Sequence, residues 1–571
     1  MKKIIFSVAL LSGMMLTSCE SMLDIEQKAI SSTESFYKTD DDAESAVMAM
    51  YAQYNNEIGG TEGIWNAYIM GLNYSADDVF AAGGDMNDHA DFRVLNEMRY
   101  SPSSAPIRVL YDHIYKSIYS ANLVISYFGG DKADTQKKKE AVAEAKVMRA
   151  WAHMLAAQVY NTPPLVDHLI VDDMPVNDKS QKEILDWCVK ECEEAIPNLP
   201  DRKGKDDKTG AWRVTKGFGQ FVGGKAALFA GDYAKCASII KPLVESGNYA
   251  LVPGERFRDL FHVEGDGCEE KIFEFNFSTN MAMGEWSGNI QRGRWMVANV
   301  LNWRGDDFVG KTTMNTKLTS DNGWGGGSIN DQFAQKMLKN DGDSYRRKAT
   351  FLTSDEFFYD ENLCGWASDA DCKTLEQKQF DPNRGITKET GSFSRSDVME
   401  VKMLMHPNDR GYSNSNNNTN LCLARLGEAY LIYAEACIKN NNLDEAKKYI
   451  NAIQKRAGSN TISETVDMQV LMDEKQYELW FEGCRWHDIV RWGIAKQCYD
   501  KVLDNIPLQW DEYFQSNGTK PHKLVYKIHH PFAENNIKLE FVAGKHEYWP
   551  IPQTTLEANP LMHQTPGWAT E

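Results

Sequence analysis

Cys19 is the residue whose chemistry is most clearly indicated by its neighbours. It closes the tetrad Leu16–Cys19, which follows a basic start at residues 2–3 and a short apolar run over residues 4–11. This order is typical of a secretory signal, and the apolar run is too short to cross a bilayer. In bacterial lipoproteins a cysteine at this boundary carries a diacylglycerol, and each buried methylene of its chains adds about 0.8 kcal/mol of membrane affinity. We therefore predict a signal peptide over residues 1–18 and a lipid anchor on Cys19.

Carboxylic acids are the most abundant groups that could act in catalysis. The chain has 81 of them, so chance pairs are unavoidable. A surface glycoside hydrolase would need two, held about 5 to 10 Å apart across a cleft, and the sequence alone leaves that enzyme open. Nothing singles out one pair, however, and neither a His-Glu-x-x-His zinc motif nor a Gly-x-Ser-x-Gly turn occurs. The pair His529–His530 is isolated, which favours a structural role over metal binding.

Tryptophan, glycine and asparagine accumulate between residues 255 and 420, where helical periodicity is mostly lost. Trp286 lies in this stretch, and Trp324 lies within the run from Asn322 to Gly327. A long irregular stretch in a helical protein is either a functional insertion or disordered, and the aromatic content argues against disorder. We therefore regard this stretch as the first candidate for a binding face. The alternative is that its tryptophans only fill a core or plug a loop.

Composition restricts the class of protein and its partners. The 571 residues are 42% hydrophobic and 25% charged, as in a large globular protein. The net charge of -19 repels nucleic acid and anionic membrane surfaces, so we expect neither as a partner, whereas a neutral carbohydrate fits. The ten cysteines besides Cys19 lack the spacing of a disulfide scaffold. We expect small buried thiols such as Cys188 and Cys192, and a bridge between Cys364 and Cys372 stays open.

The predicted helices form the framework that must position these candidate residues. The sequence predicts helices over residues 43–54, 111–127 and 139–160. Two later helix–turn–helix segments place small residues twelve apart, Gly224 with Cys236 and Ala434 with Ala446. Small residues at such positions let paired helices approach closely, which is the tetratricopeptide pattern in degenerate form. Generic helical hairpins are the alternative.

One further helix is predicted near the end of the chain. Its apolar stripe includes Tyr477 and Cys484, and its charged face runs from Glu478 to Arg491 before Gly493 ends it. A charged row of this kind more often forms structural salt bridges than a catalytic site.

Five segments along nearly the whole chain carry a family resemblance. They are the Cys19 tetrad with Leu23–Ile25, the stretch Glu144–Trp151 leading to Pro163–Val166, Leu423–Ala436, Glu478–Gly493, and Tyr548–Gln553 with Asn559–Pro560 and Pro566–Trp568. Each is modest alone, but in this order they resemble the SusD/RagB family of outer-membrane nutrient-binding lipoproteins of Bacteroidota.

The resemblance implies a mainly α fold, in which about four tetratricopeptide-like units support a large irregular, loop-rich ligand-binding half with minor β structure. The implied regions are a signal peptide at 1–18, a lipidated tether at 19–42, an N-terminal helical region at 43–254, the irregular ligand-binding insertion at 255–420, and a C-terminal region at 421–571 with the last repeat unit and a loop-rich tail.

The resemblance also implies a function. Such proteins are surface-exposed receptors that capture oligosaccharide and deliver it to a SusC-like TonB-dependent transporter in the outer membrane. No catalysis and no cofactor are expected, although a structural Ca²⁺ in the Asp/Asn-rich loops stays open. Members of the family also serve peptide uptake, so a peptide receptor is the alternative. A tetratricopeptide scaffold that binds only protein is a third possibility.

The resemblance suggests site residues as well. In the starch-binding founder of the family, an arc of aromatics stacks on the glycan, and one of them is the tryptophan of an Asn-Gly-Trp motif. Asn322 to Trp324 matches that motif, and Trp286 is a looser match to a second aromatic. Asp77 and Asp78 are candidate acceptors for sugar hydroxyls, with turn or capping roles as the alternative. A tryptophan-rich segment of the founder is replaced here by Ala81–Gly84, which argues against starch as the ligand.

Overall fold

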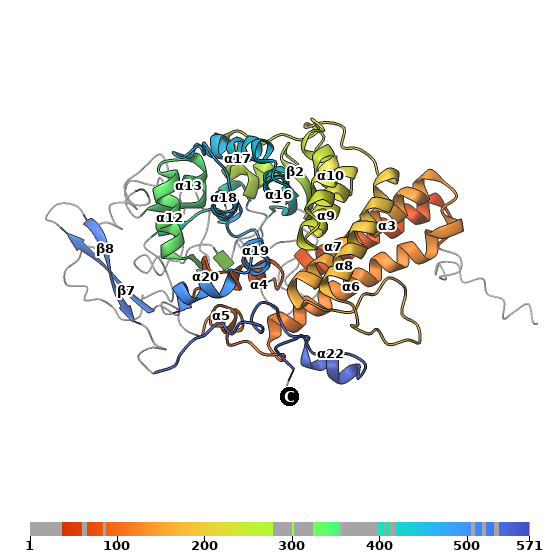
Figure 1. Cartoon of the computed structure of the whole chain (residues 1–571), viewed down its shortest axis with the longest axis horizontal. Coiled ribbons are helices and arrows are strands. Elements are labelled where there is room, and N and C mark those ends of the chain that lie inside the picture. Colours follow the sequence, from red (N-terminus) through yellow and green to blue (C-terminus); the bar gives the residue numbers. More distant parts are fainter. Residues whose placement is uncertain are drawn as a thin grey trace, which may run out of the picture.

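The computed structural model describes most of the chain (Figure 1). The described residues are 37–59, 66–83, 87–277, 300–301, 324–353, 356, 398–404, 406–409, 418–503, 509–516, 521–529 and 536–569, with 509–516 and 521–529 described by their backbone alone. Several predictions fall outside the described residues, namely those on Cys19, Trp286, Asn322, Cys364, Cys372 and His530.

Helices dominate the described residues, as the sequence predicts. The helices of the repeat region are α3 (Asp40–Tyr54), α6 (Ala105–Phe128), α7 (Gln136–Tyr160), α8 (Gln181–Ala195), α9 (Lys216–Phe229), α10 (Tyr233–Val244), α16 (Leu426–Lys439), α17 (Leu443–Ala457) and α18 (Met468–Leu479). The others are α4 (Ile69–Tyr74), α5 (Ala90–Asn96), α12 (Asp331–Asp341), α13 (Tyr345–Thr350), α19 (Arg485–Arg491), α20 (Ala495–Val502) and α22 (Gln553–Ala558). Among these residues, none of the helices has the length and apolar character that a bilayer crossing demands.

The repeat helices pack in chain order, each against the next, from α6 through α10 and on to α16, α17 and α18, while α3 packs on α6 and α7. The predicted hairpins are α9–α10 and α16–α17, so the mainly α, repeat-based fold class is confirmed. A Cβ on Gly224 would overlap Ile240, and one on Gly223 would lie 3.0 Å from Cys192 Cβ. Glycine therefore stands where α9 approaches its neighbours too closely for a side chain.

The described strands form four two-stranded antiparallel ladders. These are β1 (Val79–Ala81) with β3 (Gly327–Ile329), β2 (Lys271–Phe275) with β6 (Leu421–Arg425), β4 (Phe351–Thr353) with β5 (Val398–Glu400), and β7 (Gln509–Ser516) with β8 (Pro521–His529). The β2–β6 ladder joins the two ends of the irregular region, so that the chain leaves and re-enters the helical body at one place. His529 is the last residue of β8.

The prediction of a single helix from Tyr477 to Arg491 was wrong. The structure divides it into α18 and α19, because Phe481 (φ 60°) and Gly483 (φ 75°) adopt left-handed backbone conformations between them. Asn73 holds this turn: its amide nitrogen donates to the Phe481 carbonyl at 3.2 Å, and its amide oxygen accepts from the Gly483 N–H at 3.1 Å. The turn therefore depends on a buried residue from a distant part of the chain.

The folded body begins slightly before the predicted boundary at residue 43. Helix α3 starts at Asp40 with a capping box formed by Thr39 and Asp42. Tyr37 already stacks on Tyr127, with ring centroids 4.0 Å apart. The last residues of the predicted tether therefore belong to the helical body.

The eight cysteines within the described residues are free thiols. Cys188 and Cys192 are buried, as predicted. Cys484 is half-buried at the end of the turn before α19.

Candidate functional site

Trp324 lies three residues before the start of strand β3 and is half-buried against the main hydrophobic core. Strand β3 pairs with β1 so that Ile329 faces Val79 and Gly327 faces Ala81. One further hydrogen bond extends this ladder toward Trp324, from the Ala82 N–H to the Gly326 carbonyl at 2.9 Å. The tryptophan is thus carried by a short, fixed ladder.

The glycines after Trp324 serve close packing. A Cβ on Gly326 would lie 2.6 Å from Val300 Cγ1, and one on Gly327 would overlap Leu301. The Tyr74 hydroxyl donates to the Gly326 carbonyl at 2.6 Å, and Gly325 has a φ of 62°, which favours glycine. The Gly-rich run therefore fixes the backbone next to Trp324.

Asp77 and Asp78 lie at the other end of the same ladder, just before β1. The Asp77 carboxylate accepts from Arg485 Nε at 2.7 Å and from a second guanidinium nitrogen at 2.9 Å. Asp78 is 1% exposed, and its carboxylate accepts from the Gln476 amide at 3.3 Å. Both carboxylates are therefore engaged within the protein, where they hold β1 against α18 and α19.

The Asp78 backbone also fixes strand β3. Its carbonyl accepts from the Asn330 N–H at 3.0 Å and from Trp480 Nε1 at 3.1 Å. Asn330 then caps α12 with its side chain. The turn between α18 and α19 thus supports, through Asp78, the ladder that carries Trp324.

The two aspartates have opposite pKa shifts. Burial raises the pKa of Asp78 to about 7, and the neighbouring Asp77 charge adds to that rise. Burial also acts to raise the pKa of Asp77, but the charge and hydrogen bonds of Arg485 outweigh it and leave that pKa below its ordinary value. Asp77 is therefore ionised at neutral pH, whereas Asp78 titrates close to neutral pH.

The charged face predicted at Glu478 to Arg491 forms buried ion-pair networks. Arg425 contacts Glu478 Oε1 at 2.8 Å, Glu270 at 2.9 Å and Glu482 at 2.7 Å. Arg346 contacts the second Glu478 oxygen at 3.1 Å. These side chains are engaged with one another, which fits the structural role that the sequence favoured.

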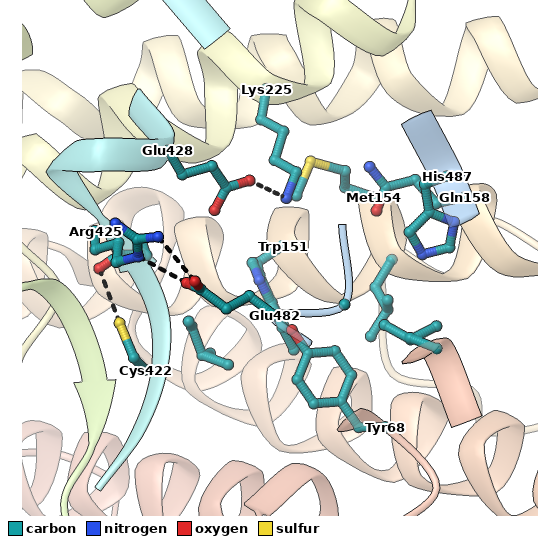
Figure 2. Close-up of a pocket in the computed structure, with 15 residues that line it drawn as sticks. Tyr68, Trp151, Met154, Gln158, Lys225, Cys422, Arg425, Glu428, Glu482 and His487 are labelled. Carbon is teal, nitrogen blue, oxygen red and sulfur yellow. Dashed lines mark hydrogen bonds and ion pairs between the residues drawn. The ribbon is translucent and has the colours of Figure 1, made fainter. Parts of the chain in front are cut away.

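A small polar cavity lies beside this network, between α7, α9, β6, α16 and the turn before α19 (Figure 2). Lys225 binds Glu428 at 2.7 Å on one side, and Gln158 and His487 lie on the other. The Gln158 amide nitrogen and His487 Nε2 have no hydrogen-bond partner among the described residues. Burial lowers the pKa of His487 to about 3, so its ring is neutral.

The volume of this cavity decides what it can hold. At about 30 Å³ it has room for one or two water molecules, whereas ligand pockets usually enclose about 300 to 1,000 Å³. The cavity is therefore too small for a sugar.

Sequence reasoning missed the residues that support Trp324. Arg485, Trp480 and Asn330 were not connected with it, because they approach it only through tertiary contacts. It also missed that the residues from Gly305 to Thr312 match the consensus sequence of a phosphate-binding loop, GxxxxGKT. That string lies outside the described residues. Within the part of the chain that is described, no cluster of three or more His, Cys, Asp or Glu side chains is arranged to hold a metal ion.

Comparison with known proteins gives two family matches. Residues 270–568 match the model described as the SusD family, and residues 31–211 match the model described as starch-binding associating with outer membrane. Among curated relatives, SusD-like protein P25 of Formosa agariphila is 23% identical, with 95% of each chain covered. The starch-binding protein SusD of Bacteroides thetaiotaomicron is also 23% identical, with 84% of this chain and 82% of that protein covered.

Solved structures share the fold. A laminarin binding SusD-like protein superposes with a TM-score of 0.69 at 20% identity, covering 93% of this chain and 100% of that chain. Surface glycan-binding protein A from Bacteroides thetaiotaomicron, in complex with laminarihexaose, gives a TM-score of 0.69 at 19% identity, covering 92% of this chain and 100% of that chain. The SusD family match alone spans more than half of the sequence, and the chain therefore belongs to the SusD family.

Proposed function

We propose that this protein is a cell-surface glycan-binding lipoprotein that captures oligosaccharide and delivers it to a SusC-like TonB-dependent transporter in the outer membrane. The names of its relatives support the ligand class, because they refer to starch, laminarin and laminarihexaose. The description of the second family match, associating with outer membrane, supports the location. Cys19 is the proposed lipid attachment point.

The placement of Trp324 is the observation that carries the proposal. A half-buried indole on a fixed ladder is prepared to stack on the C–H face of a sugar with little loss of conformational entropy. We propose Asn322 and Trp286 as further ligand contacts. Asp77 and Asp78 take a positioning role, because their carboxylates are already engaged with Arg485 and Gln476.

We propose further that the protein binds its ligand without chemical turnover and needs no cofactor. Among the described acids, Asp77 and Glu478 are held by guanidinium groups that stabilise their charged forms. A carboxylate held in this way is a poor general acid, which a glycoside hydrolase requires. Asp78 has a pKa raised to about 7, but its side chain is buried, at 1% exposure, and is not accessible to a glycan.

Titration calorimetry tests the proposal. The soluble chain without Cys19, residues 20–571, is titrated with starch, laminarin, host-mucin and microbial glycans, and product analysis follows each titration. We expect saturable binding of one glycan, which Trp324→Ala abolishes and which leaves the sugar intact. Trp187→Ala is the matched control, because Trp187 is also half-buried but lies on α8.

Each other outcome has a definite meaning. Cleavage of the bound glycan would show an enzyme. Binding that persists in Trp324→Ala would move the site elsewhere. If no glycan binds but a peptide panel does, the peptide-uptake alternative replaces the proposal.

A further inference from the structure

A groove of about 720 Å³ lies between helices α3 and α6, at the opposite side of the molecule from α12 (Figure 1). Strand β3 precedes α12 directly, so the groove is remote from Trp324. Its volume falls in the usual range of ligand pockets. The proposed function assigns no role to this groove.

One wall of the groove is a row of tyrosines on α6. Tyr111, Tyr115 and Tyr119 are spaced at i, i+4 and i+8, so they lie along one face of the helix. Tyr111 is 5% exposed and Tyr119 is 54% exposed, so the row runs from the floor of the groove to its mouth. Tyr37 adds a fourth ring to the lining.

The other wall consists of small and flexible side chains on α3. Ala46, Ala49, Met50 and Gln53 recur at i, i+3, i+4 and i+7, and they face the tyrosines across the groove. The two alanines leave space beside the row, in which Tyr119 is the most exposed ring at 54%. Bulky residues at these positions would fill the space, so the open groove depends on them.

The charged groups of the groove are neutralised in pairs. Lys116 Nζ lies 3.5 Å from Glu57, and Asp112 lies 3.2 Å from Arg108. The lining therefore offers little net charge, although the whole chain carries -19. A groove of this kind suits an uncharged ligand.

We infer that this groove is a second carbohydrate-binding site. Tyrosine faces accept the C–H faces of sugar rings, and Gln53, Ser120 and the phenol groups can exchange hydrogen bonds with sugar hydroxyls. The Gln53 amide nitrogen already donates to Glu57 at 2.6 Å and the Ser120 hydroxyl to the Ser117 carbonyl at 2.7 Å, so these two groups would meet a sugar hydroxyl chiefly through their oxygens, as acceptors. A long glycan that contacts both this groove and the Trp324 site gains affinity through avidity.

This inference rests on the proposed function, and its test must separate the two sites. Tyr119→Ala removes an exposed ring at the mouth of the groove, and Ala49→Trp fills the groove from α3. Tyr345→Ala is the matched control, because Tyr345 is 48% exposed and lies at the start of α13, on the far side of the molecule. Each variant of residues 20–571 is compared with wild type and with Trp324→Ala.

The probes are laminarin and amylose, with laminarihexaose and maltohexaose as their short counterparts. The readouts are calorimetric stoichiometry and hydrogen exchange of the peptides that cover residues 40–54, 105–128 and 324–341. For a glycan that binds, we expect two hexaose sites per chain and protection of all three segments. Tyr119→Ala and Ala49→Trp should abolish only the protection in α3 and α6 and weaken polymer binding about 2- to 10-fold, while Tyr345→Ala changes neither.

One hexaose site, with groove variants that bind like the control, would overturn the inference and leave the proposed function intact. Protection of α3 and α6 by laurate but by no glycan would assign the groove to an apolar ligand and also overturn it. If none of the four probes binds wild type or protects any segment, the inference fails together with glucan binding at Trp324.

Discussion

The carboxylate of Asp77 and the guanidinium of Arg485 form a two-pronged ion pair between residues 408 positions apart in the chain. The pair joins the segment before β1 to the first residue of α19. Because β1 pairs with β3, this contact holds the ladder that carries Trp324. An ion pair outside the ladder therefore helps to set the position of the candidate binding residue.

Replacing Arg485 with methionine should leave the Asp77 carboxylate without its cation. We expect the free energy of unfolding to fall by about 3 to 5 kcal/mol, as for other broken buried pairs, and urea denaturation measures it. Adding Asp77→Asn should restore part of the loss. Arg108→Met is the control, because its pair with Asp112 is about half exposed, and it should cost less than about 1 kcal/mol.

Replacing Asp78 with asparagine should change how stability depends on pH. Unfolded aspartate titrates near pH 3.9, whereas folded Asp78 keeps its proton up to about pH 7. The wild type therefore loses stability as the pH rises between these values, and asparagine removes that loss. Between pH 4.5 and pH 8, the free energy of unfolding of Asp78→Asn should rise by about 1 to 3 kcal/mol relative to wild type.

Thermal or urea unfolding at several pH values measures this difference. Asp500→Asn, at a position whose side chain is 52% exposed, should show no such trend. A difference between Asp78→Asn and wild type that stays constant across the pH range would contradict the prediction.

The effect of Glu478 on the pH dependence of stability should be opposite to that of Asp78, and it should appear at acid pH. Burial raises its pKa, but the charges of Arg456, Arg425 and Arg346 outweigh burial and leave the pKa well below its ordinary value. Glu478 thus contributes stability that is complete above about pH 4.3, where the unfolded side chain titrates, and that is lost as the pH falls toward the folded pKa.

Arg346→Met removes one of these three charges and should move the acid-unfolding midpoint to higher pH. Circular dichroism between pH 2 and pH 6 measures the midpoint. Arg256→Met, at a side chain that is 43% exposed, is the control and should leave the midpoint within about 0.3 pH unit of wild type. Equal midpoints for the two variants would count against the network as a source of acid stability.

Gly224→Ala should destabilise the α9–α10 hairpin, because the new methyl group would overlap Ile240. Overpacking of this kind costs about 1 to 3 kcal/mol. In a double-mutant cycle measured by urea denaturation, Ile240→Ala should make the glycine substitution nearly neutral. Additive losses would mean that the two helices move apart instead.

Local patterns predicted a large part of the fold. The helices at 43–54, 111–127 and 139–160 were predictable because their apolar residues recur with the helical period and their ends carry clear stop signals. The α9–α10 and α16–α17 hairpins were predictable from small residues flanking a turn. Family membership was predictable because its motifs stand in order along the sequence.

The break between α18 and α19 was not predictable in the same way. The sequence from Tyr477 to Arg491 has helical periodicity, and the turn at Phe481 to Gly483 forms because Asn73 bonds to its backbone from 408 residues away. Such a long-range contact overrides the local preference for a helix, and the periodicity of the sequence does not indicate it.

The sequence by itself determined the helical repeats, the family and the candidacy of Trp324, since each depends on residue types at fixed spacing. Only the tertiary structure decided that Asp77 and Asp78 point into the protein, and that alanines on α3 face tyrosines on α6 across an open groove. These relationships join residues far apart in the chain, and their energies depend on distance and burial in the folded state, which spacing along a sequence does not specify.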